Sequence, residues 1–66
     1  MNEECYLLIF YNGVSRRTQK YKTLNRAIEG ATFKYGHGEQ TKIYKIRGNE
    51  IVAEYSSWGR ELASYE

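Results

Sequence analysis

The sequence has no proline and no aspartate, and among its 66 residues it has one cysteine and one histidine. A lone Cys5 excludes an internal disulfide, and no set of Cys and His has the spacing of a zinc site. A Ser–His–acid triad needs a firmly oriented base, whereas His37 lies between Gly36 and Gly38. We therefore expect a non-enzymatic protein with no metal and no cofactor.

Long apolar runs are also missing. The longest, Tyr6–Tyr11, is far below the roughly 20 residues that a membrane-spanning helix needs. A single cysteine suits a reducing compartment, so we expect a cytoplasmic protein that does not enter the membrane. A chain this short predicts one small domain over residues 1–66, with modest stability.

Positive charge is concentrated in the middle of the chain, although the net charge is only +2. Between Val14 and Arg47 nine Lys and Arg oppose two Glu, a balance of +7, and the flanking segments are acidic. One interpretation is a basic surface that binds an anionic partner. The other is that neighbouring strands interleave these charges into mixed ion pairs.

The remaining pattern predicts an α+β fold of order ββαββ, an antiparallel sheet with one helix packed on one face. Asn12-Gly13 and Gly48-Asn49 are typical of tight hairpin turns, and Thr23 is a favourable helix N-cap. The predicted strands are residues 5–11, 14–22, 40–47 and 51–56, and the predicted helix is residues 24–35, ending at Gly36. The polar second strand is expected at an edge of the sheet and the apolar first strand at its centre.

The expected core combines the apolar stripe of the helix with one face of the sheet. Ile43 and Ile46 have opposite parity in the third strand, which predicts a β-bulge or burial on both faces. Residues 57–66 are expected to form a docked short helix or a mobile tail. The predicted core residues are Leu7, Ile9, Leu24, Ile28, Ala31, Tyr35, Ile43, Ile46 and Val52.

Phe33 does not belong to the apolar stripe, because at 100° per residue it lies opposite Leu24. Either the helix frays after Thr32 and Phe33 folds into the core, or the helix continues and Phe33 is exposed. Gly30 in the helix interior costs about 1 kcal/mol relative to alanine, which favours a close approach of the backbone at that position.

Two kinds of binding surface fit this composition, which includes seven tyrosines. Aromatic and arginine side chains are enriched at protein interfaces, and the candidates for a protein partner are Phe33, Arg26, Tyr21 and Trp58. The alternative is direct DNA or RNA binding by a basic hairpin arm. Its candidates are Arg16, Arg17, Lys20, Lys22, Lys42, Lys45 and Arg47.

The segment Thr18–Ala31, in which a strand leads through Thr23-Leu24 into a helix carrying Ala27 and Ala31, is similar to a layout found in very small phage-encoded proteins. Inhibitors of host RNA polymerase and some anti-CRISPR proteins have this layout. The resemblance implies an accessory protein that modulates a host protein or ribonucleoprotein by binding to it. We expect such a protein to be a monomer or a homodimer formed through an edge strand.

Overall fold

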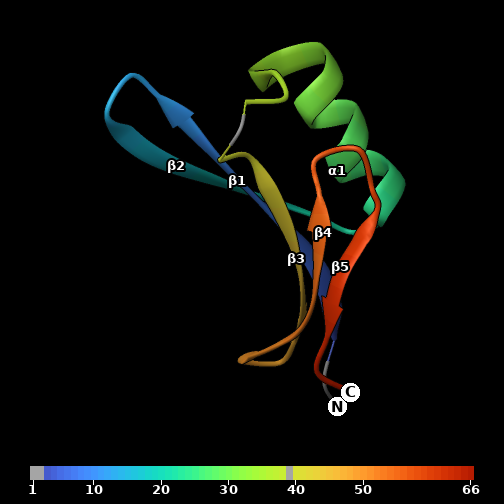
Figure 1. The fold of residues 1–66 in the computed structure, drawn as a ribbon. Coiled ribbons are helices and arrows are strands. Elements are labelled where there is room, and N and C mark those ends of the chain that lie inside the picture. Colours follow the sequence, from blue (N-terminus) through green and yellow to red (C-terminus); the bar gives the residue numbers. More distant parts are fainter. Residues whose placement is uncertain (1–2, 39) are drawn as a thin grey trace.

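The computed structural model describes residues 3–38 and 40–66, which form a five-stranded antiparallel sheet with one helical segment packed against one face (Figure 1). This confirms the predicted α+β fold, in which the predicted ββαββ order is followed by a fifth strand. The elements are β1 (Glu4–Asn12), β2 (Ser15–Tyr21), α1 (Leu24–Gly30), η1 (Ala31–Tyr35), β3 (Lys42–Arg47), β4 (Glu50–Ser56) and β5 (Glu61–Ser64).

The strands lie in the order β2-β1-β3-β4-β5. The basic strand β2 lies at an edge, as predicted from its polar composition. Strand β1 is interior, paired with β2 on one side and β3 on the other, as predicted for the apolar first strand. With β5 added beyond β4, β3 is the middle one of the five strands.

Strand β5 forms in the segment for which the sequence suggested a short helix or a mobile tail. After β4 the chain turns back through residues 57–60, and the backbone N–H of Gly59 donates to the carbonyl oxygen of Ser56 at 2.9 Å. The Ser56 hydroxyl also accepts from the backbone N–H of Arg60 at 3.1 Å. These bonds close a tight reversal, and β5 then pairs antiparallel with β4.

The first hairpin turns one residue later than predicted. Asn12 pairs with Ser15, so the two turn residues are Gly13 and Val14 rather than Asn12 and Gly13. Gly13 has a φ of 66°, and no residue other than glycine has a positive φ in the described chain. A two-residue turn that has a positive φ only at its first position needs glycine at that position and not at the second. Gly13 occupies the first position, and Asn12 therefore belongs to the strand.

The second hairpin turns at Gly48-Asn49 as predicted, with Arg47 opposite Glu50. The register of β3 against β4 shifts between Lys45 and Ile46. The extra residue is Val52 of β4, whereas β3 pairs with β1 without interruption. Ile43 and Ile46 therefore point to opposite faces of the sheet, which is the predicted alternative of burial on both faces and not a bulge in the third strand.

The helix begins at the predicted cap, where the Thr23 hydroxyl accepts from the backbone N–H of Arg26 at 3.2 Å. It continues through α1 into η1, a widened π-helical turn in which the N–H of Gly36 donates to the carbonyl oxygen of Ala31. The helical backbone therefore reaches Tyr35, and Phe33 is 80% exposed instead of folding into the core.

The core lies between the helix and one face of the sheet. Leu8 and Ile43 are fully buried there beside Ala27 and Ala31. Because successive side chains of a strand point to opposite faces, Tyr6 and Phe10 share the face of Leu8, and both pack against this cluster.

Several predicted core residues lie elsewhere. Leu7 and Ile9 alternate with Leu8, so they lie on the face away from the helix and are only half-buried. Tyr35 is partly exposed, and Ile46 is half-buried beside the bulge. The other predicted core residues are either buried or packed against buried residues, as predicted; these are Leu24, Ile28, Ala31, Ile43 and Val52.

The turn end of the first hairpin projects away from α1 (Figure 1). We call residues 11–20 the arm, and every one of them is exposed, with Val14 at the tip fully so. The arm is therefore held by backbone hydrogen bonds between β1 and β2 and buries little apolar surface.

Because Leu8 and Leu7 lie on opposite faces of the sheet, truncating each of them should lower the free energy of unfolding by a different amount. Leu8→Ala opens a cavity between the sheet and α1 and should lower the free energy of unfolding by about 2–5 kcal/mol. Leu7→Ala removes a half-buried side chain from the other face and should cost clearly less. Urea titrations followed by circular dichroism measure both, and equal losses would contradict the assignment.

Candidate functional site

Three of the four residues predicted to contact a protein partner line one surface hollow. Tyr21, Arg26 and Phe33 surround a space of about 240 Å³ together with Glu29, Gly30 and Lys34. We call it the Phe33 hollow. Tyr21 comes from the end of β2 and the others from α1 and η1, so the junction between strand and helix forms this surface.

Gly30 allows the floor of the Phe33 hollow to form. A Cβ atom at this position would lie 2.6 Å from the ring carbon Cζ of Tyr21 and closer still to its hydroxyl. The tyrosine ring therefore lies directly on the helix backbone, the close approach predicted for Gly30. Burial raises the pKa of Tyr21, and the nearby Tyr35 hydroxyl adds to the shift.

Arg26 and Phe33 differ in how they are held. The Arg26 guanidinium lies 3.8 Å from the Glu29 carboxylate, and both side chains are largely exposed. Such an exposed pair contributes little to stability, so Arg26 remains accessible. Phe33 projects from η1 with most of its ring in solvent.

Trp58, the fourth predicted residue, belongs to a separate feature. Its ring stacks on His37 with a centroid separation of 3.5 Å and an interplanar angle of 8°, and it is 66% exposed. The two His37 nitrogens hydrogen-bond with the Thr32 hydroxyl at 2.9 Å and with the Ser57 hydroxyl at 2.8 Å. His37 therefore ties η1 to the turn between β4 and β5.

From the sequence, His37 was interpreted only as a residue unsuited to catalysis, because it lies in a loop between two glycines. In the structure, the Ser57–His37 contact lacks the carboxylate that a Ser–His–acid triad places on the other ring nitrogen, because Thr32 occupies that position. Ser57 is also 95% shielded from solvent. The arrangement holds two segments together.

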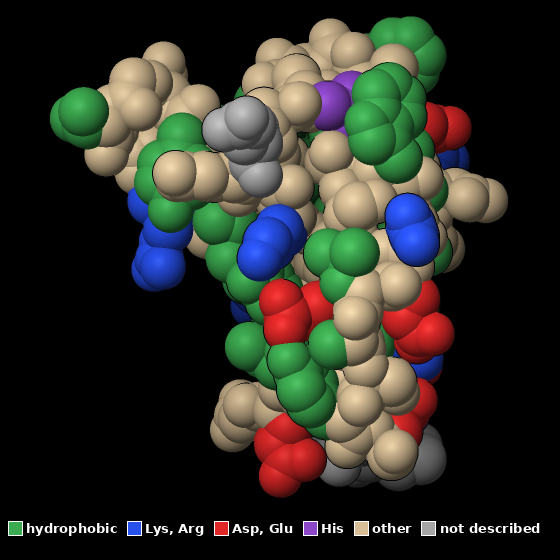
Figure 2. All heavy atoms as spheres, in the orientation of Figure 1, with side chains coloured by type: hydrophobic (Ala, Val, Ile, Leu, Met, Phe, Trp, Pro, Cys, Tyr) green, Lys and Arg blue, Asp and Glu red, His purple; other side chains and the backbone are tan. Residues whose placement is uncertain are grey.

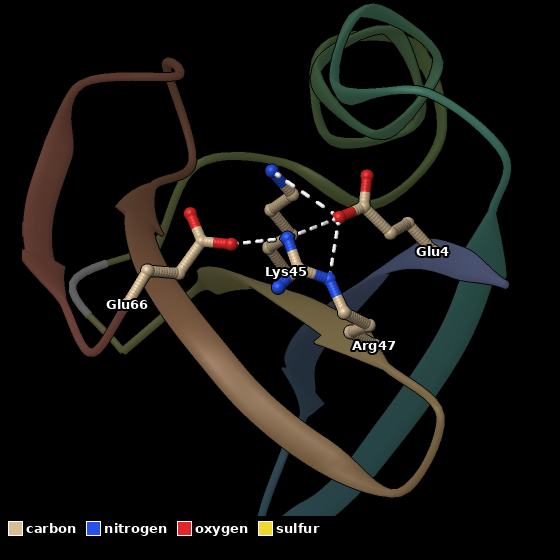
Figure 3. Close-up of polar contacts among 4 residues, drawn as sticks. All are labelled: Glu4, Lys45, Arg47 and Glu66. Atoms are coloured by element: carbon tan, nitrogen blue, oxygen red, sulfur yellow. Dashed lines mark hydrogen bonds and ion pairs between the residues drawn. The ribbon is translucent and has the colours of Figure 1, made fainter. Parts of the chain in front are cut away.

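Two of the predicted nucleic-acid-binding residues are engaged in a cluster of ion pairs (Figure 3). Glu4 lies 2.6 Å from the Arg47 guanidinium and 3.8 Å from the Lys45 ammonium. Arg47 also pairs with Glu66. We call these four residues the Glu4 cluster, and it joins β1, β3 and the residues after β5. Here the interpretation of interleaved charges applies.

The Arg47 hydrogen bond is the largest cause that holds the pKa of Glu4 below its ordinary value of 4.5. The same bond raises the pKa of Arg47. Lys45 and Arg47 therefore have acidic partners already.

The other basic candidates are divided by the sheet. Arg16, Lys20 and Lys42 align with Tyr11, Leu7 and Ile9 on the face that the helix leaves uncovered, which we call the open face. Arg17 pairs with Phe10 on the helix side, and Lys22 follows the end of β2. The predicted hairpin arm thus directs its cations to different sides.

The open face includes a second hollow that the sequence alone did not reveal. It measures about 360 Å³, and its lining comes from β1, β2, β3 and the approach to β3. The recurrence of Lys and Tyr in β2 and β3 was visible in the sequence. Their convergence depends on β1 lying between these two strands. The lining residues are Ile9, Tyr11, Arg16, Gln40, Lys42 and Tyr44.

On the face drawn in Figure 2, blue Lys and Arg side chains lie on the arm and across the middle, while most red acidic side chains lie below them. In the Glu4 cluster, the carboxylate of Glu4 neutralises the cations Lys45 and Arg47. The segregation of charge along the sequence therefore persists in part on the surface.

No protein-family model, no curated protein and no solved structure matches this chain. Within residues 3–38 and 40–66, no group of three or more His, Cys, Asp or Glu side chains is placed to hold a metal ion. In that same part of the chain, every helix is too short or too polar to cross a membrane.

The Glu4 cluster predicts a dependence of stability on pH. Because the pKa of Glu4 is lowered by folding, its contribution is present above about pH 4.5 and is lost as the pH falls through the lowered value. Glu4→Gln should flatten the decline in melting temperature below pH 4.5, whereas Glu3→Gln should not. Thermal melts between pH 2.5 and pH 7 compare them, and parallel curves for Glu4→Gln and the wild type would contradict this role.

Proposed function

We propose that this protein is a small non-enzymatic binding protein that recognises another protein through the Phe33 hollow. The observation that supports the proposal is an aromatic ring, 80% exposed, standing beside an accessible arginine and a tyrosine. Phe, Tyr and Arg are the side chains that dominate interface energetics when they enter a pocket of the partner.

The chemistry of the hollow indicates what the partner should offer. Complete burial of an exposed Phe ring stabilises a complex by about 2 kcal/mol. Arg26 and Lys34 flank the ring, and Glu29 is already paired with Arg26. The matching surface is therefore an apolar pocket with a carboxylate at its rim. Charge complementarity of this kind favours fast association and correct orientation.

The mode of action that fits is occlusion of a surface on the target. Similarity of Thr18–Ala31 to small phage-encoded inhibitors supports a protein or ribonucleoprotein of a bacterial host as the target. On this proposal the protein acts inside the host cytoplasm, is encoded by a phage or mobile element, and modulates its target by binding alone.

Phe33→Ala tests the proposal, with Ile51→Ala as the matched control because Ile51 is a half-exposed apolar residue on β4. Tagged wild type and both variants are incubated with nuclease-treated bacterial lysate. We expect wild type and Ile51→Ala to retain the same protein, and Phe33→Ala to bind it about 30-fold more weakly, as for a hot-spot loss of about 2 kcal/mol.

Circular dichroism should show that all three proteins are folded, since Phe33 contributes little to the core. Retention of the partner by Phe33→Ala at wild-type affinity would overturn the proposal. So would recovery that disappears whenever nuclease is present, because the retained protein would then be linked through nucleic acid.

A further inference from the structure

The open face combines three strands that lie apart in the sequence. Strand β1 lies between β2 and β3, so residues of all three form rows across the face. One row places Lys20 beside Leu7 and Leu7 beside Tyr44. Other pairings place Arg16 beside Tyr11 and Lys42 beside Ile9. Cationic and aromatic side chains therefore alternate over an apolar floor.

The rings on this face are accessible. Tyr11 is 43% exposed and Tyr44 half-buried, and both line the hollow of about 360 Å³. Tyr11 lies four residues along β1 from Leu7, the partner of Tyr44. At about 3.3 Å per residue this separates the two tyrosines by about 13 Å along the strand. Each ring can therefore contact a different group of an extended ligand.

The cations of the open face differ from those of the Glu4 cluster. Within the described residues, no ion pair involves Arg16, Lys20 or Lys42, whereas Lys45 and Arg47 have acidic partners. The acid Glu54 lies opposite Tyr44 and accepts a hydrogen bond from the Tyr65 hydroxyl. The cationic part of the face therefore extends over β2, β1 and the start of β3.

We propose that the open face binds single-stranded nucleic acid, with Arg16, Lys20 and Lys42 contacting phosphates and the rings of Tyr11 and Tyr44 stacking on bases. Lys and Arg release counterions from a phosphate backbone, and aromatic rings stack on any unpaired base. A duplex keeps its bases stacked on one another, so only a single strand uses both parts of this surface. The proposal is independent of the Phe33 hollow, which lies on the helix side.

The alternation of side chains distinguishes this ligand from an acidic polypeptide. An acidic polypeptide would satisfy the cations but would offer no flat rings to Tyr11 and Tyr44. The aliphatic side chains of Leu7 and Ile9 lie between the cations, where the apolar faces of bases can cover them. A polyanion that carries planar groups at regular intervals matches both features.

Fluorescence anisotropy with a labelled 20-nucleotide oligothymidylate tests the proposal. At about 50 mM salt we expect saturable binding, and three phosphate contacts predict a slope of log K against log salt of about −2. Arg16→Gln should weaken binding and reduce the magnitude of that slope by about 0.7. Tyr44→Leu should weaken binding about tenfold, with the slope unchanged, because it removes stacking and no charge.

Arg17→Gln is the matched control, since Arg17 is the next residue of the same strand but pairs with Phe10 on the helix side. It should leave the affinity within about twofold of wild type, and Phe33→Ala should do the same. Equal losses for Arg16→Gln and Arg17→Gln would overturn the assignment to the open face. The proposal is also overturned by an absence of binding, by equal affinity for a duplex, or by equally strong competition from polyglutamate.

Discussion

Leu8 and Ile43 occupy directly opposed positions on β1 and β3, and both pack beneath the small side chains of Ala27 and Ala31. This contact is the point at which the single helix meets the sheet. Alanine on the helix lets its backbone approach closely, and the two branched side chains fill the space between the layers. Since residues 3–38 and 40–66 supply one helical segment to five strands, that segment covers one face of the sheet.

The two candidate surfaces follow from that constraint. On the covered side, the helix that packs over Leu8 presents its outer residues, and the widened turn of η1 directs Phe33 to solvent while Tyr35 stacks on Phe10 at 4.0 Å. On the uncovered side, Leu7 and Ile9 have no helix above them. Lys20 pairs with Leu7 and Lys42 with Ile9, and such side chains can lay their aliphatic stems on apolar neighbours while their charged ends stay in water.

Much of this fold could be predicted because its signals are local. Thr23, Gly36 and the opposite parities of Ile43 and Ile46 each act within a few residues, and the structure confirms the cap, the helix end and the placement of the two isoleucines on opposite faces. The face of β1 could not be predicted. Its even-numbered residues Tyr6, Leu8 and Phe10 are as apolar as Leu7 and Ile9 between them, so no alternation distinguishes the two sets.

Other features depended on long-range pairing. Strand β5 is short, and its backbone hydrogen bonds to β4, rather than an apolar pattern, define it. The contacts of His37 with Thr32 and Ser57 join residues 5 and 20 positions away, and only the folded chain brings them together. Similarly, the hollow on the open face requires β1 to separate β2 from β3. The candidate residues could be identified from the sequence, but their division between faces could not.

The exposed arm has an energetic consequence for recognition. Residues 11–20 are held chiefly by the ladder between β1 and β2, and segments with few buried apolar contacts open at a fraction of the free energy of global unfolding. Lys42 and Tyr44, by contrast, belong to an interior strand paired on both sides. A ligand that bridges Arg16 and Lys42 therefore joins a loosely held segment to a firmly held one. Part of its binding free energy is spent on ordering the arm, and the amide protons of the arm should become slower to exchange when the ligand is bound.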